Sequence, residues 1–290
     1  HESSRGNTTF VLKGSDFGTD TENDAYLKAV SLVVKKLVVK ELDREGTNWS
    51  KFADFLADCQ ELIEIEGQSN GLTDAGAIEL GKAIKGCTGL EVFNFKQNKI
   101  EDDGMRELAE GLKANESLKT IDISNNLVSV GGAEALSELL TLSSSLETLV
   151  MNHNKLGDEG ATALAEGIKT SPSLKTLHIH VNMIKSEGGV AIGKALETNN
   201  SLEEINFMGN LICDAGGVQL AQAVTANTSL KNLNLASMDI GSRGCSALYK
   251  ALGENTSIEK LNFSWNQIND EYKKKMKKAC KDSNIALTIQ

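Results

Sequence analysis

The sequence predicts an α/β solenoid, in which repeats of one short parallel strand and one helix stack into a single array. The first observation is a fixed interval of 28 residues, without insertion or deletion, between recurring leucines or isoleucines. The second is that each interval has a strand-like half followed by a helix-like half. A constant period of this length is typical of solenoids, whose units bury their apolar faces against their neighbours. The recurring positions are Leu62, Leu90, Leu118, Leu146, Leu174, Leu202, Leu230 and Ile258.

The first half of each repeat follows the pattern L-x-x-L-x-L-x-x-N-x-L. In the repeat that begins at Leu118, the apolar places are held by Ile121, Ile123 and Val128. Alternation with a period of two predicts a strand with one buried face. We expect the asparagine to be buried and to bond the backbone of its own turn and of the next repeat. It recurs as Asn70, Asn98, Asn126, Asn154, Asn182, Asn210 and Asn266, and Met238 is the exception.

The second half of each repeat has helical spacing. Gly160, Leu164 and Ile168 fall four apart, so they share one face of a helix. Before the next strand, several repeats carry an asparagine that we expect to end the helix in the left-handed conformation. The same asparagines form glycosylation sequons, which we interpret as a coincidence of the repeat. They are Asn115, Asn199, Asn227 and Asn255.

The chain ahead of Leu62 departs from the repeat, as expected of a terminal unit with a neighbour on one side only. A helical pattern runs from Asp20 to about Val33, and a degenerate repeat follows in which Leu42 replaces the asparagine. The next helix carries several large aromatic residues, which predict either a cap with a thicker core or an aromatic patch for a partner. They are Trp49, Phe52 and Phe55.

The C-terminal segment forms a second atypical unit. Tyr272, Met276 and Cys280 are four apart and predict one buried helix face. Lysines cover the rest of this helix, and we favour a solvated cap over a site for phosphate-rich partners. Ala286 and Ile289 fall one further period on and predict a last strand that seals the sheet. The lysines are Lys273, Lys274, Lys275, Lys277, Lys278 and Lys281.

Residues 62–285 resemble a leucine-rich repeat array of the ribonuclease-inhibitor type. The resemblance implies a right-handed α/β horseshoe of nine to ten repeats, with an inner parallel sheet and outer helices. Geometry agrees, since helices pack ~8–10 Å apart and strands ~4.8 Å apart, so the stack must curve toward the sheet. The expected domains are an N-terminal arm and capping repeat (1–61), the repeat array (62–269), and a cap helix and strand (270–290).

Composition narrows the class of protein. The net charge of −10 argues against non-specific binding of nucleic acid. No apolar stretch reaches the ~18 residues of a membrane span, and the first residue is not methionine, so we expect part of a longer product. The five scattered cysteines favour buried thiols in a reducing compartment. We therefore predict a cytoplasmic monomer.

Motifs for chemistry are largely absent from the sequence. It contains no glycine-rich phosphate loop, no zinc-spaced Cys/His set and no nucleophile elbow, so we predict no catalytic residue and no cofactor. His153, His178 and His180 lie on two adjacent repeats and are expected to converge. Such a cluster can bind zinc or copper, form a pH-sensitive partner contact, or have no role. Because no second shell is recognisable, we predict no metal site.

The concave sheet face is the expected binding surface, because a rigid repeated surface recognises a partner with little ordering entropy. Trp265 is either an interface anchor or a residue packed against the cap helix. We predict a non-enzymatic scaffold for another protein, like the arrays of ribonuclease inhibitors and NOD-like receptors. The alternatives are a GTPase regulator resembling the Ran GTPase-activating protein, or an actin-filament cap like tropomodulin. The candidate contact residues are Asp122, Val150, Asn152, His153, His178, His180, Asn206, Met208, Asn234, Asn262 and Trp265.

Overall fold

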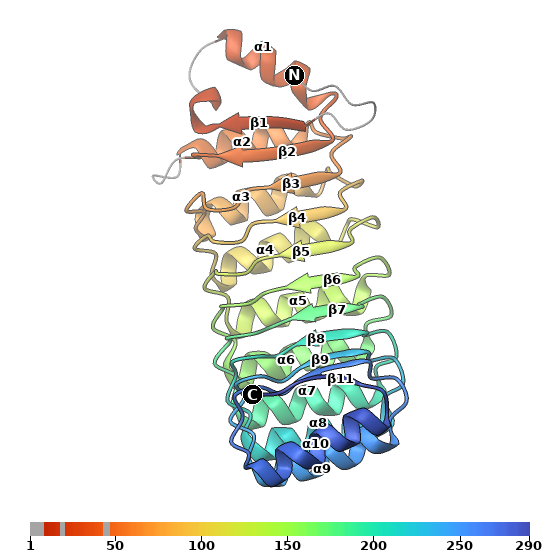
Figure 1. The fold of residues 1–290 in the computed structure, drawn as a ribbon. Coiled ribbons are helices and arrows are strands. Elements are labelled where there is room, and N and C mark those ends of the chain that lie inside the picture. The colour runs from red at the N-terminus through yellow and green to blue at the C-terminus, as the bar shows by residue number, and fades with distance from the viewer. Residues whose placement is uncertain (1–8, 18–20, 43–46) are drawn as a thin grey trace.

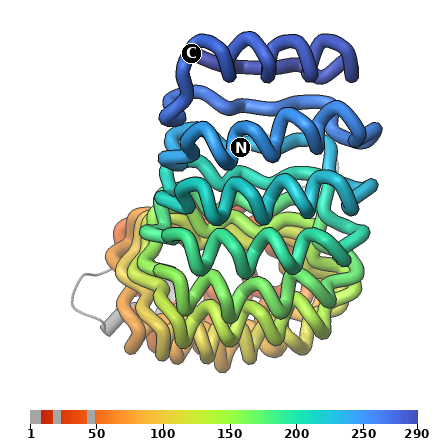
Figure 2. Tube along the Cα trace, turned by 90° about the horizontal axis from the view of Figure 1, so that it is seen from below, coloured from red at the N-terminus to blue at the C-terminus, as the bar shows by residue number. Residues whose placement is uncertain are grey.

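The computed structural model describes residues 9–17, 21–42 and 47–290. In these ranges, eleven parallel strands form one sheet in sequence order, and ten α-helices line one side of it (Figure 1). The stack bends along its length (Figure 2). The strands occupy the inner, concave side because they lie closer together than the helices do.

Strands and helices alternate along the array. The strands are β1 (Thr9–Lys13), β2 (Lys36–Lys40), β3 (Glu64–Glu66), β4 (Val92–Asn94), β5 (Thr120–Asp122), β6 (Thr148–Val150), β7 (Thr176–His178), β8 (Glu204–Asn206), β9 (Asn232–Asn234), β10 (Lys260–Asn262) and β11 (Ala286–Thr288). The helices are α1 (Thr21–Ser31), α2 (Thr47–Ala57), α3 (Asp74–Ile84), α4 (Asp102–Leu112), α5 (Val130–Leu142), α6 (Gly157–Thr170), α7 (Ser186–Thr198), α8 (Cys213–Ala226), α9 (Ser242–Glu254) and α10 (Asp270–Asp282), with a 3₁₀ turn η1 (Gly14–Phe17). No helix in the described ranges is long and apolar enough to span a membrane.

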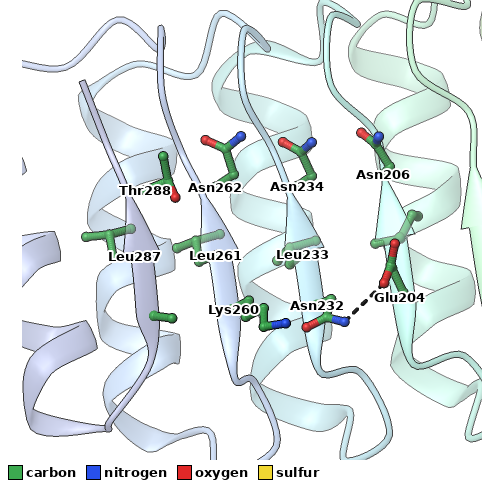
Figure 3. Close-up of a pocket in the computed structure, with 12 residues that line it drawn as sticks. Glu204, Asn206, Asn232, Leu233, Asn234, Lys260, Leu261, Asn262, Leu287 and Thr288 are labelled. Atoms are coloured by element: carbon green, nitrogen blue, oxygen red, sulfur yellow. Dashed lines mark hydrogen bonds between the residues drawn. The ribbon is translucent and has the colours of Figure 1, made fainter.

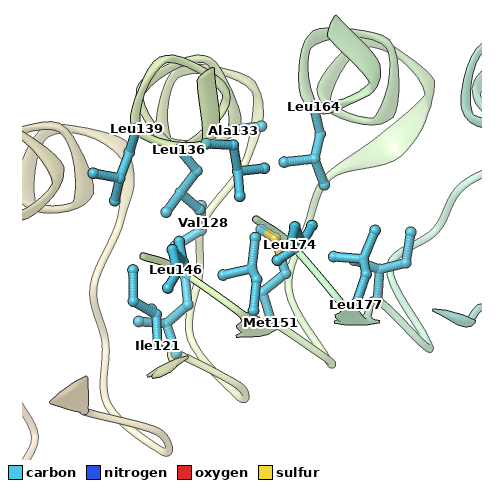
Figure 4. Packing of buried hydrophobic residues seen from close by; sticks show 14 of the residues in the cluster. Ile121, Val128, Ala133, Leu136, Leu139, Leu146, Met151, Leu164, Leu174 and Leu177 are labelled. Carbon is cyan, nitrogen blue, oxygen red and sulfur yellow. The ribbon is translucent and has the colours of Figure 1, made fainter. Parts of the chain in front are cut away.

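The core fills the space between the sheet and the helices. The leucines that define the period, such as Leu146 and Leu174, are fully buried and lie beside each other across the repeat boundary (Figure 4). Leu164 of α6 reaches toward them from the helical side. Each buried leucine contributes about 1.5–3 kcal/mol relative to an exposed one, so the period itself stabilises the stack. Strand register keeps this period from β2 to β10, as in the pairing of Thr148 with Thr176.

The ladder asparagines are buried and bond their own turn, as predicted, but the predicted bond to the next repeat is wrong, because the side chains bond the preceding repeat. Asn182 is fully buried, and its Oδ1 accepts a hydrogen bond from the Asn154 amide at 3.2 Å. Its Nδ2 donates to the carbonyls of Met151 and Ile179 at 2.9 and 3.1 Å. Each ladder asparagine therefore joins the turn of its own repeat to the turn of the preceding one. Met238, the predicted exception, fills the same place with a buried thioether.

The prediction that asparagines end the helices in the left-handed conformation is wrong. Asn199 has φ −72° and ψ 133°, which is extended backbone. Its Oδ1 accepts from the Leu202 amide at 2.8 Å, and its Nδ2 donates to the Ile168 carbonyl at 2.7 Å. The four asparagines of this class are buried and bonded across repeats, so the sequons are part of the core.

The N-terminal unit is an aromatic cap. Trp49, Phe52 and Phe55 are buried, and Phe17 meets Phe52 edge to face at 5.8 Å. The alternative of an aromatic patch open to a partner is therefore wrong. The sheet also begins one strand earlier than the sequence predicts, because β1 pairs with β2. Helix α1 ends at Ser31, slightly before the predicted end.

The C-terminal unit closes the other end with a helix and a strand, as predicted, but the predicted register of the strand is wrong, because Leu261 pairs with Leu287 and Ile289 lies beyond β11. Met276 and Cys280 of α10 are buried, whereas the lysines of this helix lie on its outer side. Strand β11 pairs with β10, and Lys260 lies opposite Ala286. Paired residues of β10 and β11 are 26 residues apart in the sequence, instead of the 28 found from β2 to β10, because the turn after α10 is short.

Candidate binding surface

The concave face is built from three columns of side chains that run along the array. The central residue of each strand points into the core, and its two neighbours are half-buried on the open side. The entry column is Glu64, Val92, Thr120, Thr148, Thr176, Glu204, Asn232 and Lys260. The exit column is Glu66, Asn94, Asp122, Val150, His178, Asn206, Asn234 and Asn262. Two residues further on, the turn column is Lys96, Ser124, Asn152, His180, Met208, Ala236 and Ser264.

Most of the predicted contact residues share this face. The exit column holds Asp122, Val150, His178, Asn206, Asn234 and Asn262, and the turn column holds Asn152, His180 and Met208. His153 and Trp265 lie just beyond the turn column, at left-handed positions with φ 53° and 57°. Asn152 is buried, and its Oδ1 accepts from the His180 amide at 3.0 Å, so it acts within the turn.

Charges in the N-terminal part of the face are paired within the chain. Lys36 Nζ contacts carboxylate oxygens of Glu64 and Glu66 at 2.7 and 2.8 Å. These two hydrogen bonds raise the pKa of Lys36 above its ordinary value. Lys96 lies 3.9 Å from the carboxylate of Asp122. A partner that binds here must compete with these internal pairs.

Histidines occupy the centre of the face. The rings of His153 and His180 meet edge to face at 5.1 Å, and His178 Nε2 lies 2.8 Å from Glu204 Oε1. Burial, together with His153 and His178, lowers the pKa of His180 below its ordinary value. Among the described residues, no three His, Cys, Asp or Glu side chains are grouped in a way that could hold a metal ion.

A groove of about 480 Å³ crosses strands β8 to β11 (Figure 3). One wall is the exit column, in which the carboxamides of Asn206, Asn234 and Asn262 lie in the same orientation. The other wall is formed by the entry column and its continuation at Ala286. The strand backbones form the floor between the walls, because the side chains of Ile205, Leu233 and Leu261 point into the core.

The exit wall is held in place by hydrogen bonds to the turns. Asn234 Oδ1 accepts from the Ala236 amide and Asn262 Oδ1 from the Ser264 amide, each at 3.2 Å. This bonding fixes the carboxamides and leaves their Nδ2 groups as donors. In the described part of the chain, neither Nδ2 has an acceptor. The groove therefore has a row of preoriented donors.

The entry wall carries one acidic and one basic side chain, Glu204 and Lys260. Asn232 Nδ2 donates to Glu204 Oε2 at 3.0 Å, whereas Asn232 Oδ1 is buried without a partner among the described residues. The hydrogen bond to His178 lowers the pKa of Glu204. Lys260 is exposed, and its charge also helps to lower the pKa of Glu204, although no carboxylate in the described ranges lies within ion-pair distance of it. The Asn232 oxygen is closed to solvent, so the charged ends of Glu204 and Lys260 are the groups through which this wall can meet a ligand.

A second feature of this surface, absent from the predicted contact residues, is a set of exposed apolar side chains at the loop edge. Val181, Met183 and Leu211 are 38, 57 and 55% exposed, on two adjacent repeats. Val181 has φ 54°, which is rare for a β-branched residue. At the position of Val181, other repeats carry polar residues such as Asn125 and Ser237. This difference is visible in the sequence and could have identified the apolar side chains at the loop edge. Trp265 lies in the same loop register and is 61% exposed, so most of its side chain is open to solvent.

Comparisons with known proteins agree with this architecture. A family model described as a leucine-rich repeat matches residues 86–109, 114–137, 142–165, 226–248 and 254–271. No curated protein matches the sequence.

Solved structures with a similar fold include a TLR13 complex with the single-stranded RNA ssRNA13, at 14% identity and a TM-score of 0.54. That match covers 97% of this chain and 36% of the TLR13 chain, so the present chain spans about a third of its length. Actin-binding site 2 of leiomodin-1 matches at 17% identity and a TM-score of 0.40, over 62% of this chain and 88% of that chain. The predicted α/β leucine-rich repeat solenoid is confirmed.

Proposed function

We propose that this leucine-rich repeat solenoid is a non-enzymatic scaffold that binds another protein on its concave sheet face. Arrays of this kind are typically binding scaffolds. The observation that carries the proposal is that each strand contributes one residue to the core and two residues to the concave face. Each central residue from β3 to β10 is buried in the core, and its two neighbours lie on the open side, half-buried or exposed. A sheet with paired neighbours on both sides holds these side chains in place before binding, which lowers the entropic cost of association.

The centre and C-terminal half of the face are the favoured contact region. Val150 and His178 lie opposite each other on neighbouring strands and belong to the exit column. Trp265 extends the surface onto the loop edge, and exposed tryptophan is a frequent source of interface binding energy. The cytoplasmic location, the monomeric state and the ribonuclease-inhibitor subtype remain predictions from the sequence.

The test compares two arginine substitutions in the same repeat. Val150→Arg places a long cation in the exit column, and Thr162→Arg places it at an exposed position on α6, on the helical side. After affinity capture of partners from a lysate of the source organism, we expect Val150→Arg to lose the proteins that wild type retains. Thr162→Arg is expected to keep them. The reverse pattern, with both variants folded by circular dichroism, would contradict the proposal.

The two alternative functions have direct assays. Acceleration of GTP hydrolysis on a panel of small GTPases would favour the GTPase regulator, and slower growth of actin filaments at the pointed end would favour the actin cap. Either activity, if abolished by Val150→Arg, would also identify the partner of the concave face.

A further inference from the structure

Helix α10 is the last helix of the array (Figure 2) and carries a local excess of positive charge. Together, α9 and α10 contain eight Lys or Arg residues and four Asp or Glu residues, whereas the whole chain contains 30 and 40. Lys275 pairs with Glu271 at 2.6 Å. The other lysines of α10 have no carboxylate within ion-pair distance in the described part of the chain. They are Lys273, Lys274, Lys277, Lys278 and Lys281, and we call them the lysine stripe.

The lysine stripe forms two adjacent rows on one side of the helix. One row has a lysine at every fourth residue from Lys273 to Lys281, and the other consists of Lys274 and Lys278. Met276, by contrast, is buried on the opposite side. The longer row covers roughly 12 Å along the helix axis. Because the two rows are neighbours on the outside of the helix, a flat surface can contact both at once.

This arrangement is unfavourable for the helix itself, because like charges four residues apart destabilise a helix. In α4, Arg106 is instead placed three residues after Asp103 and pairs with it at 2.6 Å. A helix that served only as a solvated cap, as the sequence favours, would gain from the same arrangement. Positions that break a local rule of stability are often functional.

Two carboxylates lie at the ends of the lysine stripe. Asp270 is four residues before Lys274, and Asp282 is four residues after Lys278, and both are exposed. They offset part of the charge of the five lysines, so the stripe remains basic. Since helices pack ~8–10 Å apart, the acidic residues of α8 and the earlier repeats lie roughly 16–20 Å or more away. That distance exceeds the ~8 Å screening length at physiological ionic strength.

We propose that the lysine stripe binds the anionic headgroups of a lipid surface. Lysines offer flexible point charges that attract many anions at once, whereas fixed recognition of a single carboxylate or phosphate favours arginine. A cluster of about four to eight Lys or Arg residues on one helix is typical of binding to anionic lipid. Helix α10 exposes no large apolar side chain, so the contact is electrostatic and does not insert into the bilayer.

This contact leaves the concave face free for a partner. Helix α10 belongs to the helical layer, and its lysines lie on the outer side, away from the sheet. The inference therefore goes beyond the proposed function: the end of the array attaches to a lipid surface while the sheet binds another protein. Each proposal can fail without the other.

The experiment measures co-sedimentation of the full chain with vesicles of phosphatidylcholine, alone or mixed with phosphatidylserine. We expect binding to the mixed vesicles at about 0.1 M salt, and its loss at about 0.5 M salt, where the charges are screened. Lys277→Glu, in the middle of the lysine stripe, should weaken this binding at least tenfold. Lys277→Ala should weaken it less, because it removes one charge without adding the opposite one.

A second measurement separates binding from folding. Lys277→Glu replaces the like-charge neighbours of Lys273 and Lys281 by an opposite charge, so its urea midpoint should equal or exceed that of wild type. Lys194→Glu makes the same change of net charge at an exposed position of α7 and should bind the vesicles like wild type.

Three results would overturn the inference: no binding to the mixed vesicles, equal binding to phosphatidylcholine alone, or equal weakening by Lys277→Glu and Lys194→Glu. Soluble polyglutamate tests the other class of anion. If it binds in a way that depends on Lys277 and the mixed vesicles do not bind, the ligand is an acidic protein segment and the lipid proposal is wrong.

Discussion

At the scale of single residues, asparagine performs three different tasks in this fold. Asn182 is buried in the turn and joins two repeats, and Asn199 is buried at a helix end and bonds the repeat before it. Asn234 stands on the open sheet, where its oxygen is used and its nitrogen is not. The side chain is the same in each case, so burial and the nearest backbone groups decide its role.

The sequence predicted the first task and misjudged the second. A ladder asparagine follows from its fixed place after the strand, since a bend there orphans backbone groups. At the helix end, the left-handed conformation was expected for Asn199, yet a carboxamide bonded to Leu202 and Ile168 satisfies those groups with extended backbone. The unpaired oxygen of Asn232 was not predictable, because it depends on the separation of side chains from three strands.

Asp102 shows how one residue links neighbouring repeats. It lies in the first turn of α4, but its Oδ1 accepts from the amides of Ser129 and Gly132 at 2.7 and 2.9 Å. These amides belong to the N-terminus of α5, the next helix. Burial acts to raise the pKa of Asp102, but hydrogen bonds from Ser129, Gly132 and Gly131 outweigh it and lower the pKa. Asp102 is therefore a helix cap supplied by the preceding repeat.

Replacing this cap should destabilise the protein. We expect Asp102→Ala to lower the free energy of unfolding by about 1–2 kcal/mol at pH 7, as for other lost N-caps. The exposed Asp103→Ala should change it by less than about 0.5 kcal/mol. Urea denaturation followed by circular dichroism measures both.

The effect of Asp102 should also depend on pH in a defined direction. Since its pKa is lower in the folded state, its stabilisation is present above the ordinary carboxyl pKa of about 3.9 and is lost as the pH falls through the folded value. The difference between wild type and Asp102→Ala should be constant from pH 7 to about 5 and shrink toward about pH 2. A difference that grows on acidification would contradict this account.

At the scale of elements, glycines set how closely the helices approach. A Cβ added at Gly167 of α6 would lie 2.6 Å from the Cα and carbonyl oxygen of Ser137 on α5. Backbone atoms cannot move aside as a flexible side chain can. At Gly253 of α9, an added Cβ would meet nothing within 4 Å. Gly167 is therefore required by the close packing of α6 on α5, whereas no neighbour requires a glycine at position 253.

These two sites predict opposite effects of the same substitution. Gly167→Ala should lower the free energy of unfolding by about 1–3 kcal/mol, because it overpacks the contact between α5 and α6. Gly253→Ala should raise it by about 0.5–1 kcal/mol, because alanine restricts the unfolded chain and favours the helix. Thermal and urea unfolding of both variants test the pair. Equal changes of one sign would show that helix propensity, rather than close packing, governs both positions.

The predictability of elements follows from the regularity of the repeat. From Leu62 to Ile268 the 28-residue period predicted both the strands and the buried helix faces, because each unit has the same kind of neighbour on both sides. Strand β1 was missed, since Phe10 pairs with Leu37 at a spacing of 27 and lacks the surrounding motif. Terminal elements are packed on one side only, so the repeat places fewer constraints on them.

At the scale of the whole molecule, charges alternate along one edge of the sheet. Lys119 pairs with Glu91 at 2.9 Å, and the same contact recurs between Lys175 and Glu147 and between Lys231 and Glu203 at 2.7 and 2.6 Å. These pairs are exposed and are screened by salt. The sign of the charge changes from each repeat to the next. If a repeat packed against the next but one along the chain, like charges would therefore be adjacent. The edge thus favours the correct register of units that are otherwise similar. The complete series is Glu91, Lys119, Glu147, Lys175, Glu203, Lys231 and Glu259.

Excising residues 118–173 tests whether the array behaves as independent neighbouring units. The deletion removes two whole repeats and brings Glu91 beside Lys175, which keeps the alternation of charge. Because each repeat contacts only its neighbours, we expect a folded protein with a lower urea midpoint and unchanged cooperativity of the remaining units. Strands β8 to β11 stay intact, so a partner that contacts only this part of the concave face should bind as it does to the full chain. A partner that also contacts Asp122 and Val150 should bind the shortened array more weakly. A deletion variant that fails to fold would contradict the description of the array as a sum of neighbouring units.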